Sequence, residues 1–110
     1  MSKIVEVKDE AGLAAALKDA PGPVVIDFVS KSCDACEADE PDLKKLAKSC
    51  ADVTVVKIDV DAASVLADKW GVQGTPSLFI AQSAAEARPG AAKEVDWASD
   101  AAKLLKKCKR

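Results

Sequence analysis

The 110-residue sequence contains no histidine and no tyrosine, and aromatic side chains make up only 4% of it. Without histidine, a Ser/His/Asp triad, a Cys/His nucleophile pair and a histidine-ligated metal site are excluded. The net charge is −2, with 16 basic and 18 acidic residues, so the composition does not favour nucleic-acid binding. The four cysteines are therefore the reactive side chains that most deserve study.

Long hydrophobic runs are also missing. No stretch approaches the roughly 18 to 20 apolar residues that would span a bilayer, so no membrane association is predicted. The first nine residues are charged every few positions and lack the apolar segment of a secretory signal. We expect a cytoplasmic protein, with a processed form in an organelle stroma or matrix as an alternative. In a reducing compartment, four cysteines do not predict a structural disulfide framework.

The length predicts one domain over residues 1–110. Hydrophobic periodicity predicts alternating strands and helices, with Asp9 capping the first helix and Gly71 ending the third. Strands are expected at 3–7, 24–29, 53–59, 77–81 and 94–97, and helices at 9–20, 34–50, 62–70 and 99–107. Short connections make the first three strands parallel and the last pair antiparallel. The predicted class is α/β, a three-layer α/β/α domain around a mixed five-stranded sheet.

A Cys-Asp-Ala-Cys motif lies directly between the buried strand 24–29 and the helix 34–50. Its first cysteine, Cys33, falls at the helix N-terminus, where free N–H groups and the helix dipole favour a thiolate without histidine. Cys36, one turn later, is placed to attack a mixed disulfide on Cys33. The alternatives are an inert pair or a metal site, but zinc would need a second ligand pair that the sequence lacks. We predict redox chemistry and no metal.

A single carboxylate, Asp27, interrupts the apolar strand 24–29. Burial should raise its pKa, because the charged form loses hydration. The alternative to a functional role is a buried aspartate satisfied by the backbone or by Lys57, and Lys57 could equally be a plain surface lysine. Thr75-Pro76 precedes the strand 77–81, and the alternative to a functional role is an ordinary turn proline at the start of that strand.

Taken in order, these motifs resemble the thioredoxin family over residues 3–107. The resemblance rests on the strand with its aspartate, the Cys-x-x-Cys pair, Pro41, Lys57-x-x-x-Asp61 and the segment 71–77. It implies the thioredoxin fold and a redox-active disulfide between Cys33 and Cys36, with no bound cofactor. It also implies a monomer that reduces protein disulfides and draws electrons from thioredoxin reductase or a similar donor.

The same resemblance assigns roles to individual residues. Cys33 would be the nucleophile and Cys36 the resolving cysteine. Asp27 would lie beneath Cys36 and move its proton, with Lys57 as its partner. Thr75 and Pro76 would form a cis peptide against the disulfide, and the Thr75 backbone would bind the substrate chain.

The chain departs from the family pattern around the motif. Thioredoxins typically have Trp-Cys-Gly-Pro-Cys, whereas this chain has Ser32 before the motif and Asp34-Ala35 within it. Asp96 stands near a position that is usually glycine. Acidic residues crowd the start of the helix: Asp34, Glu37, Asp39 and Glu40. They either complement the helix dipole on a solvated face or, with Asp96, form a negative rim that selects basic targets.

These departures leave a second function open, a binding or regulatory module of a larger assembly with little or no reductase activity. The missing tryptophan and the acidic rim favour that alternative, while the intact cysteine pair, Asp27 and Thr75-Pro76 oppose it.

The remaining cysteines and tryptophans are given simpler expectations. Trp70 should cap the core, and Trp97 is either structural or covers the motif. Cys50 and Cys108, at the ends of two helices, are either two unconnected thiols or a regulatory disulfide.

Overall fold

The computed structural model describes residues 4–96 together with residues 103, 104 and 106. Five strands form one sheet in the order β1-β3-β2-β4-β5. Their bounds are Ile4–Val7 for β1, Val24–Val29 for β2, Thr54–Asp59 for β3, Ser77–Ala81 for β4 and Lys93–Val95 for β5. Strands β1 and β2 are parallel to β3, whereas β4 is antiparallel to both β2 and β5. The predicted mixed five-stranded sheet is confirmed.

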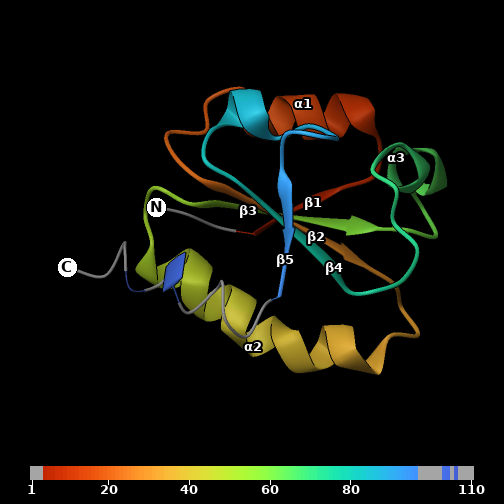
Figure 1. Ribbon diagram of the computed structural model, residues 1–110. Coiled ribbons are helices and arrows are strands. Elements are labelled where there is room, and N and C mark those ends of the chain that lie inside the picture. Colours follow the sequence, from red (N-terminus) through yellow and green to blue (C-terminus); the bar gives the residue numbers. More distant parts are fainter. Residues whose placement is uncertain (1–3, 97–102, 105, 107–110) are drawn as a thin grey trace.

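Helices cover both faces of this sheet, which gives three layers. Helices α1 (Glu10–Leu17) and α3 (Ser64–Lys69) lie on one side, and the long α2 (Asp34–Ser49) lies on the other (Figure 1). A short 3-10 turn, Ala84–Glu86, lies between β4 and β5. Of the predicted final helix, residues 103, 104 and 106 are described and are helical; Trp97 lies outside the described residues.

The central strand β2 is buried almost throughout, because both of its faces are covered. Val24, Ile26 and Phe28 belong to the core on the α1 and α3 side, whereas Val25 belongs to the core beneath α2. Asp27, two residues after Val25, therefore faces α2 as well. Because side chains alternate between the two faces along β2, the Asp27 carboxylate faces α2, the helix that begins at the cysteine motif.

Trp70 ends α3 and packs edge-on or tilted against Phe28 and Phe79, with ring centroids 5.0 to 5.7 Å away. Only 7% of Trp70 is exposed, which confirms its predicted place in the core. The predicted caps are also present: Asp9 Oδ1 accepts a hydrogen bond from the Gly12 N–H at 2.7 Å, and Gly71 has a φ of 68°. No helix in the described part of the chain is long and apolar enough to cross a membrane.

A candidate redox site at the start of helix α2

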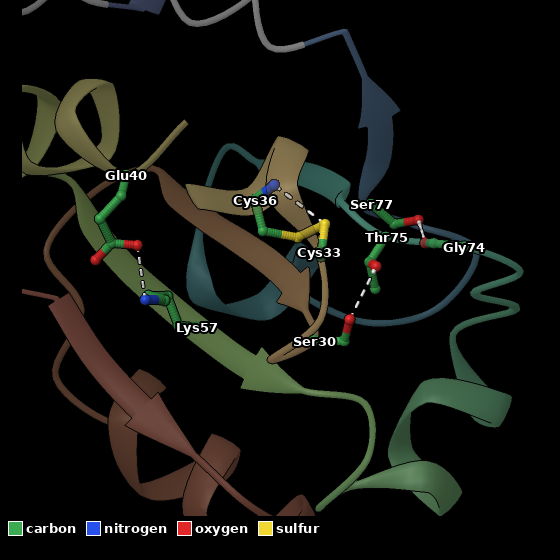
Figure 2. The surroundings of a disulfide bond; sticks show 8 residues. All are labelled: Ser30, Cys33, Cys36, Glu40, Lys57, Gly74, Thr75 and Ser77. Atoms are coloured by element: carbon green, nitrogen blue, oxygen red, sulfur yellow. Dashed lines mark hydrogen bonds and ion pairs between the residues drawn. A yellow bond between two sulfur atoms is a disulfide. The ribbon is translucent and has the colours of Figure 1, made fainter. Parts of the chain in front are cut away.

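Cys33 and Cys36 are joined by a disulfide at the N-terminus of α2 (Figure 2). Cys33 is the N-cap residue of the helix, and its Sγ accepts a hydrogen bond from the Cys36 N–H at 3.1 Å. Cys33 is partly exposed, whereas Cys36 is only 5% exposed. The two sulfurs are thus unequal: an external reagent can reach Cys33 more readily than Cys36.

The loop before β4 lies beside this disulfide. The Cys33 N–H donates to the Ser30 carbonyl at 3.3 Å, and the Ser30 and Thr75 hydroxyl oxygens are 3.4 Å apart. Figure 2 shows Thr75 next to Cys33. The Thr75-Pro76 peptide is cis, as expected, and the Ser77 hydroxyl donates to the Gly74 carbonyl at 2.6 Å. The structure therefore brings the two sequence-predicted segments together.

Asp27 is 1% exposed, and neither of its carboxylate oxygens has a hydrogen-bond partner among the described residues. Burial raises the pKa of Asp27 to about 7, since the charged form loses its hydration. The neighbouring Asp39 and Glu40 carboxylates contribute to this increase, while the Lys57 ammonium opposes it. Asp27 can therefore both hold and release a proton near neutral pH.

Lys57 corrects one prediction. We expected it to bond Asp27, its register neighbour on β3, but Lys57 Nζ instead donates to Glu40 Oε2 at 2.8 Å. The Glu40 side chain is long enough to reach down from α2 to the lysine (Figure 2), and the ion pair stays nearer to water than Asp27 does. Lys57 consequently acts on Asp27 through its charge and not through a direct hydrogen bond.

A cavity of about 490 Å³ opens beside Cys36, where β1, β2 and β3 end. Cys36 lines it together with the Glu40–Lys57 ion pair and with charged residues of both signs, namely Glu6, Lys8, Lys31, Glu37 and Asp59. Its walls therefore connect the buried side of the disulfide with solvent. Among the described residues, no group of three or more metal-ligating side chains is found.

The acidic residues near the cysteine motif differ in their exposure and in the elements that carry them. Asp34, within the motif, is exposed in the first turn of α2. Burial and the neighbouring Asp42 raise the pKa of Asp39. Asp96, also exposed, follows β5, and the antiparallel pairing of Leu78 with Val95 places it at the end of the sheet where β4 begins, near Pro76.

Cys50 is the C-cap residue of α2; it is fully buried and disulfide-bonded. The expectation of an unconnected Cys50 thiol is therefore wrong, while Cys108, its partner in the alternative expectation, lies outside the described residues. The pairing of Cys50 with Cys108 therefore stays a prediction.

The sequence patterns did not single out two residues of the site, Glu40 and Ser30. By sequence alone, Glu40 is one of several acidic residues at the start of α2. Its spacing of four residues from Cys36 nevertheless places it on the same helix face as Cys36, above Asp27. That spacing was the signal that could have identified it. Ser30 offered no comparable signal, because its contact with Thr75 joins segments 45 residues apart.

The domain is an α/β domain with the thioredoxin fold. Three features define it: the order of the strands in the sheet, the helix that begins at Cys33, and the neighbouring cis Thr75-Pro76 bond. Solved structures agree. A thioredoxin from Trichomonas vaginalis is 30% identical, with a TM-score of 0.74, covering 96% of this chain and 97% of that one. A mutant thioredoxin from Halobacterium salinarum is 29% identical, with a TM-score of 0.76 and coverage of 96% and 88%.

The sequence profile described as Thioredoxin matches residues 3–110. The chain belongs to the thioredoxin family. Among curated relatives, the thioredoxin of Rhodospirillum rubrum is 40% identical over 62 residues, which are 56% of this chain and 60% of the relative. The matched part spans only about half of several such relatives, between 46% and 55% of their lengths.

Proposed function

We propose that this chain is a thiol–disulfide oxidoreductase that reduces disulfides of partner proteins through Cys33 and Cys36. One observation carries the proposal: the two cysteines form a disulfide at the start of α2, with Cys33 partly exposed and Cys36 buried. Family membership supports the same chemistry.

In the reduced protein, Cys33 is the attacking group. Its thiolate, favoured by the free N–H groups of the first turn of α2, attacks one sulfur of the partner disulfide. A Cys33–partner disulfide forms, and the other partner sulfur leaves as a thiolate. Cys36 then attacks Cys33 Sγ, which expels the second partner thiolate and closes the Cys33–Cys36 disulfide. Two electrons pass from the dithiol to the partner.

Protons must move with these electrons, and Asp27 is the proposed carrier. The Asp27 carboxylate takes the Cys36 proton before Cys36 attacks, and the proton afterwards goes to a departing partner thiolate. A base with a pKa near the working pH is suited to this exchange, and the Asp27 pKa of about 7 meets that condition. Lys57 tunes this group by its charge.

Substrate docking is proposed at Thr75 and Pro76, next to Cys33, with Asp34 and Asp96 on the rim. Extended partner segments would pair with the Thr75 backbone, and basic residues near the target disulfide would be favoured. Thioredoxin reductase or a similar donor would return the electrons, and no bound cofactor is needed for the exchange. A cytoplasmic or organellar monomer is the working expectation.

Insulin reduction with dithiothreitol as electron source tests the proposal. The wild type should accelerate precipitation of the insulin B chain, whereas Cys33→Ser should fall to the dithiothreitol background. Ser32→Ala, an exposed neighbour, serves as the matched control and should keep the wild-type rate. A wild type no faster than background would refute reductase activity and favour the binding-module alternative.

A further inference from the structure

Lys57 stands between two carboxylates, and it bonds only one of them. Asp27 and Lys57 are register neighbours on β2 and β3, so their side chains project from the same face of the sheet. The Lys57 ammonium is nevertheless 2.8 Å from Glu40 Oε2, while both Asp27 oxygens lack a hydrogen-bond partner among the described residues. A buried carboxyl next to a lysine ordinarily gains by bonding it, so something must hold the lysine elsewhere.

We propose that Glu40 is a positioning residue for proton transfer at Asp27, because its carboxylate holds the Lys57 ammonium at the cavity and keeps it from the Asp27 carboxyl. This inference rests on the proposed function for its biological meaning. Its geometric content, the choice of Lys57 between two carboxylates, does not depend on any reductase activity.

The charged groups around Asp27 make the position of Lys57 decisive. Helix α2 carries Asp39 and Glu40, and the charges of both raise the pKa of Asp27. Strand β3 contributes Lys57, whose charge lowers that pKa, and the register partner on β4 is the uncharged Leu78. Cys36, on α2, is the titratable neighbour whose proton Asp27 is proposed to accept. A change in the position of one ammonium group therefore changes the proton affinity of Asp27.

Glu40 sets this balance in two ways. Its negative charge raises the pKa of Asp27 directly, and its ion pair restrains Lys57, the cation that lowers that pKa. When Glu40 loses its charge, Lys57 becomes able to turn toward Asp27 and form a charge-assisted hydrogen bond with the carboxylate. A base that is ionised too strongly accepts the Cys36 proton less readily, so the resolving step would lose driving force.

The test is a pH titration of the Asp27 carboxyl in the disulfide form of the protein. The titration is monitored by NMR on protein that carries ¹³C-labelled aspartate. In Glu40→Gln, the Asp27 pKa should fall by about one unit or more, the size typical of gaining an opposite charge at contact distance. Glu37→Gln is the matched control, since it removes the same charge from the same helix and cavity but from a residue that does not bond Lys57. It should leave the Asp27 pKa within a few tenths of the wild-type value.

A double-mutant cycle separates restraint of Lys57 from the direct effect of the Glu40 charge. In a Lys57→Met background, Glu40→Gln should lower the Asp27 pKa by much less than it does when Lys57 is present. An equal decrease in both backgrounds, or no decrease with Lys57 present, would overturn the proposal. Glu40→Asp, which keeps the charge on a shorter side chain, should lie between wild type and Glu40→Gln.

These titrations need neither a substrate nor a reductase, so they stand apart from the insulin assay. Failure of insulin reduction with a normal Glu40 effect would refute the proposed function and keep the positioning role. Normal insulin reduction with no effect of Glu40→Gln on the Asp27 pKa would refute the positioning role and keep the proposed function.

Discussion

Asp27 is the residue at which folding and chemistry conflict. A carboxylate that is 1% exposed and lacks a described hydrogen-bond partner destabilises the fold when it is ionised. Its raised pKa expresses the same cost, because the folded protein binds the proton more tightly than the unfolded chain does. An apolar side chain, like those of its β2 neighbours, would be buried at this position at a lower cost than an ionised aspartate. The aspartate therefore fits the proposed proton transfer better than it fits the packing of the core.

Asp27→Asn should remove a specific pH dependence of stability. Between the ordinary pKa of 3.8 and the folded value of about 7, the folded wild type binds more protons, so its stability falls as pH rises through this window. At about 1.4 kcal/mol per pKa unit, the loss amounts to about 4 kcal/mol. Urea unfolding of the disulfide form at several pH values measures it.

The free energy of unfolding of Asp27→Asn should therefore increase steadily relative to that of the wild type from pH 4 to pH 7. Above pH 8 the difference between the two should be constant. Two stability curves that run parallel across the whole range would contradict the assignment of the raised pKa to Asp27.

At the residue scale, the sequence pointed to several side chains of the candidate site, but not to Ser30 or to the carboxylate that Lys57 bonds. Cys33, Cys36 and Asp27 could be predicted because their neighbours in sequence fix their environment: a buried strand, then a helix start. The Glu40–Lys57 ion pair depends on how far two flexible side chains reach across 17 residues of sequence. No local pattern encodes that distance.

Helix α2 is the element on which the proposed redox chemistry depends. Its first turn supplies the Cys36 N–H, which donates to the Cys33 sulfur at 3.1 Å. The same turn carries the acidic side chains of Asp34 and Glu37. The N–H groups favour the Cys33 thiolate, whereas the neighbouring carboxylates oppose it, so the two effects compete within a single turn.

Asp34→Gly should lower the pKa of the Cys33 thiol in the reduced protein, because it removes the acidic side chain that follows Cys33 in the sequence. We expect a decrease of about half a unit, typical of an exposed charge at short range. Thiolate absorbance at 240 nm against pH measures it, with Asp34→Asn testing the charge without the added flexibility of glycine.

Asp52→Asn, an exposed acid beyond the end of α2, is the control and should leave the Cys33 pKa unchanged. An unchanged or higher Cys33 pKa in both Asp34 variants would contradict the opposing role of Asp34.

At the element scale, the order of strands and helices followed from periodicity, and the bounds of β2 matched the prediction residue for residue. The start of α3 did not, because the N–H groups of Ala62 and Ala63 both donate to the Asp59 carbonyl. This tight turn delays the helix to Ser64. The lateral order β1-β3-β2-β4-β5 depends on long-range pairing, which local patterns do not contain.

Across the whole molecule, the acidic groups around the disulfide should select partners by charge. Asp34 and Asp96 are exposed at opposite elements, the start of α2 and the end of β5. Charges of one sign near a reactive group raise the encounter rate with partners of the opposite sign, and salt weakens that effect.

We therefore expect peptide disulfides flanked by lysines to be reduced several-fold faster than the same peptides flanked by glutamates, at low ionic strength. The ratio should shrink toward one in high salt and in the Asp34→Asn/Asp96→Asn double variant. Equal rates for both peptides at low salt, measured by stopped flow with the reduced protein, would contradict charge selection.

The central claim is that one disulfide passes from a partner to Cys33 and Cys36. Reduced protein is mixed with excess insulin, quenched by alkylation and digested with trypsin, which releases residues 32–44 as one peptide holding both cysteines. The account predicts that this peptide changes from doubly alkylated to internally disulfide-bonded as one insulin disulfide opens per chain. A peptide that stays doubly alkylated while insulin remains oxidised would contradict it.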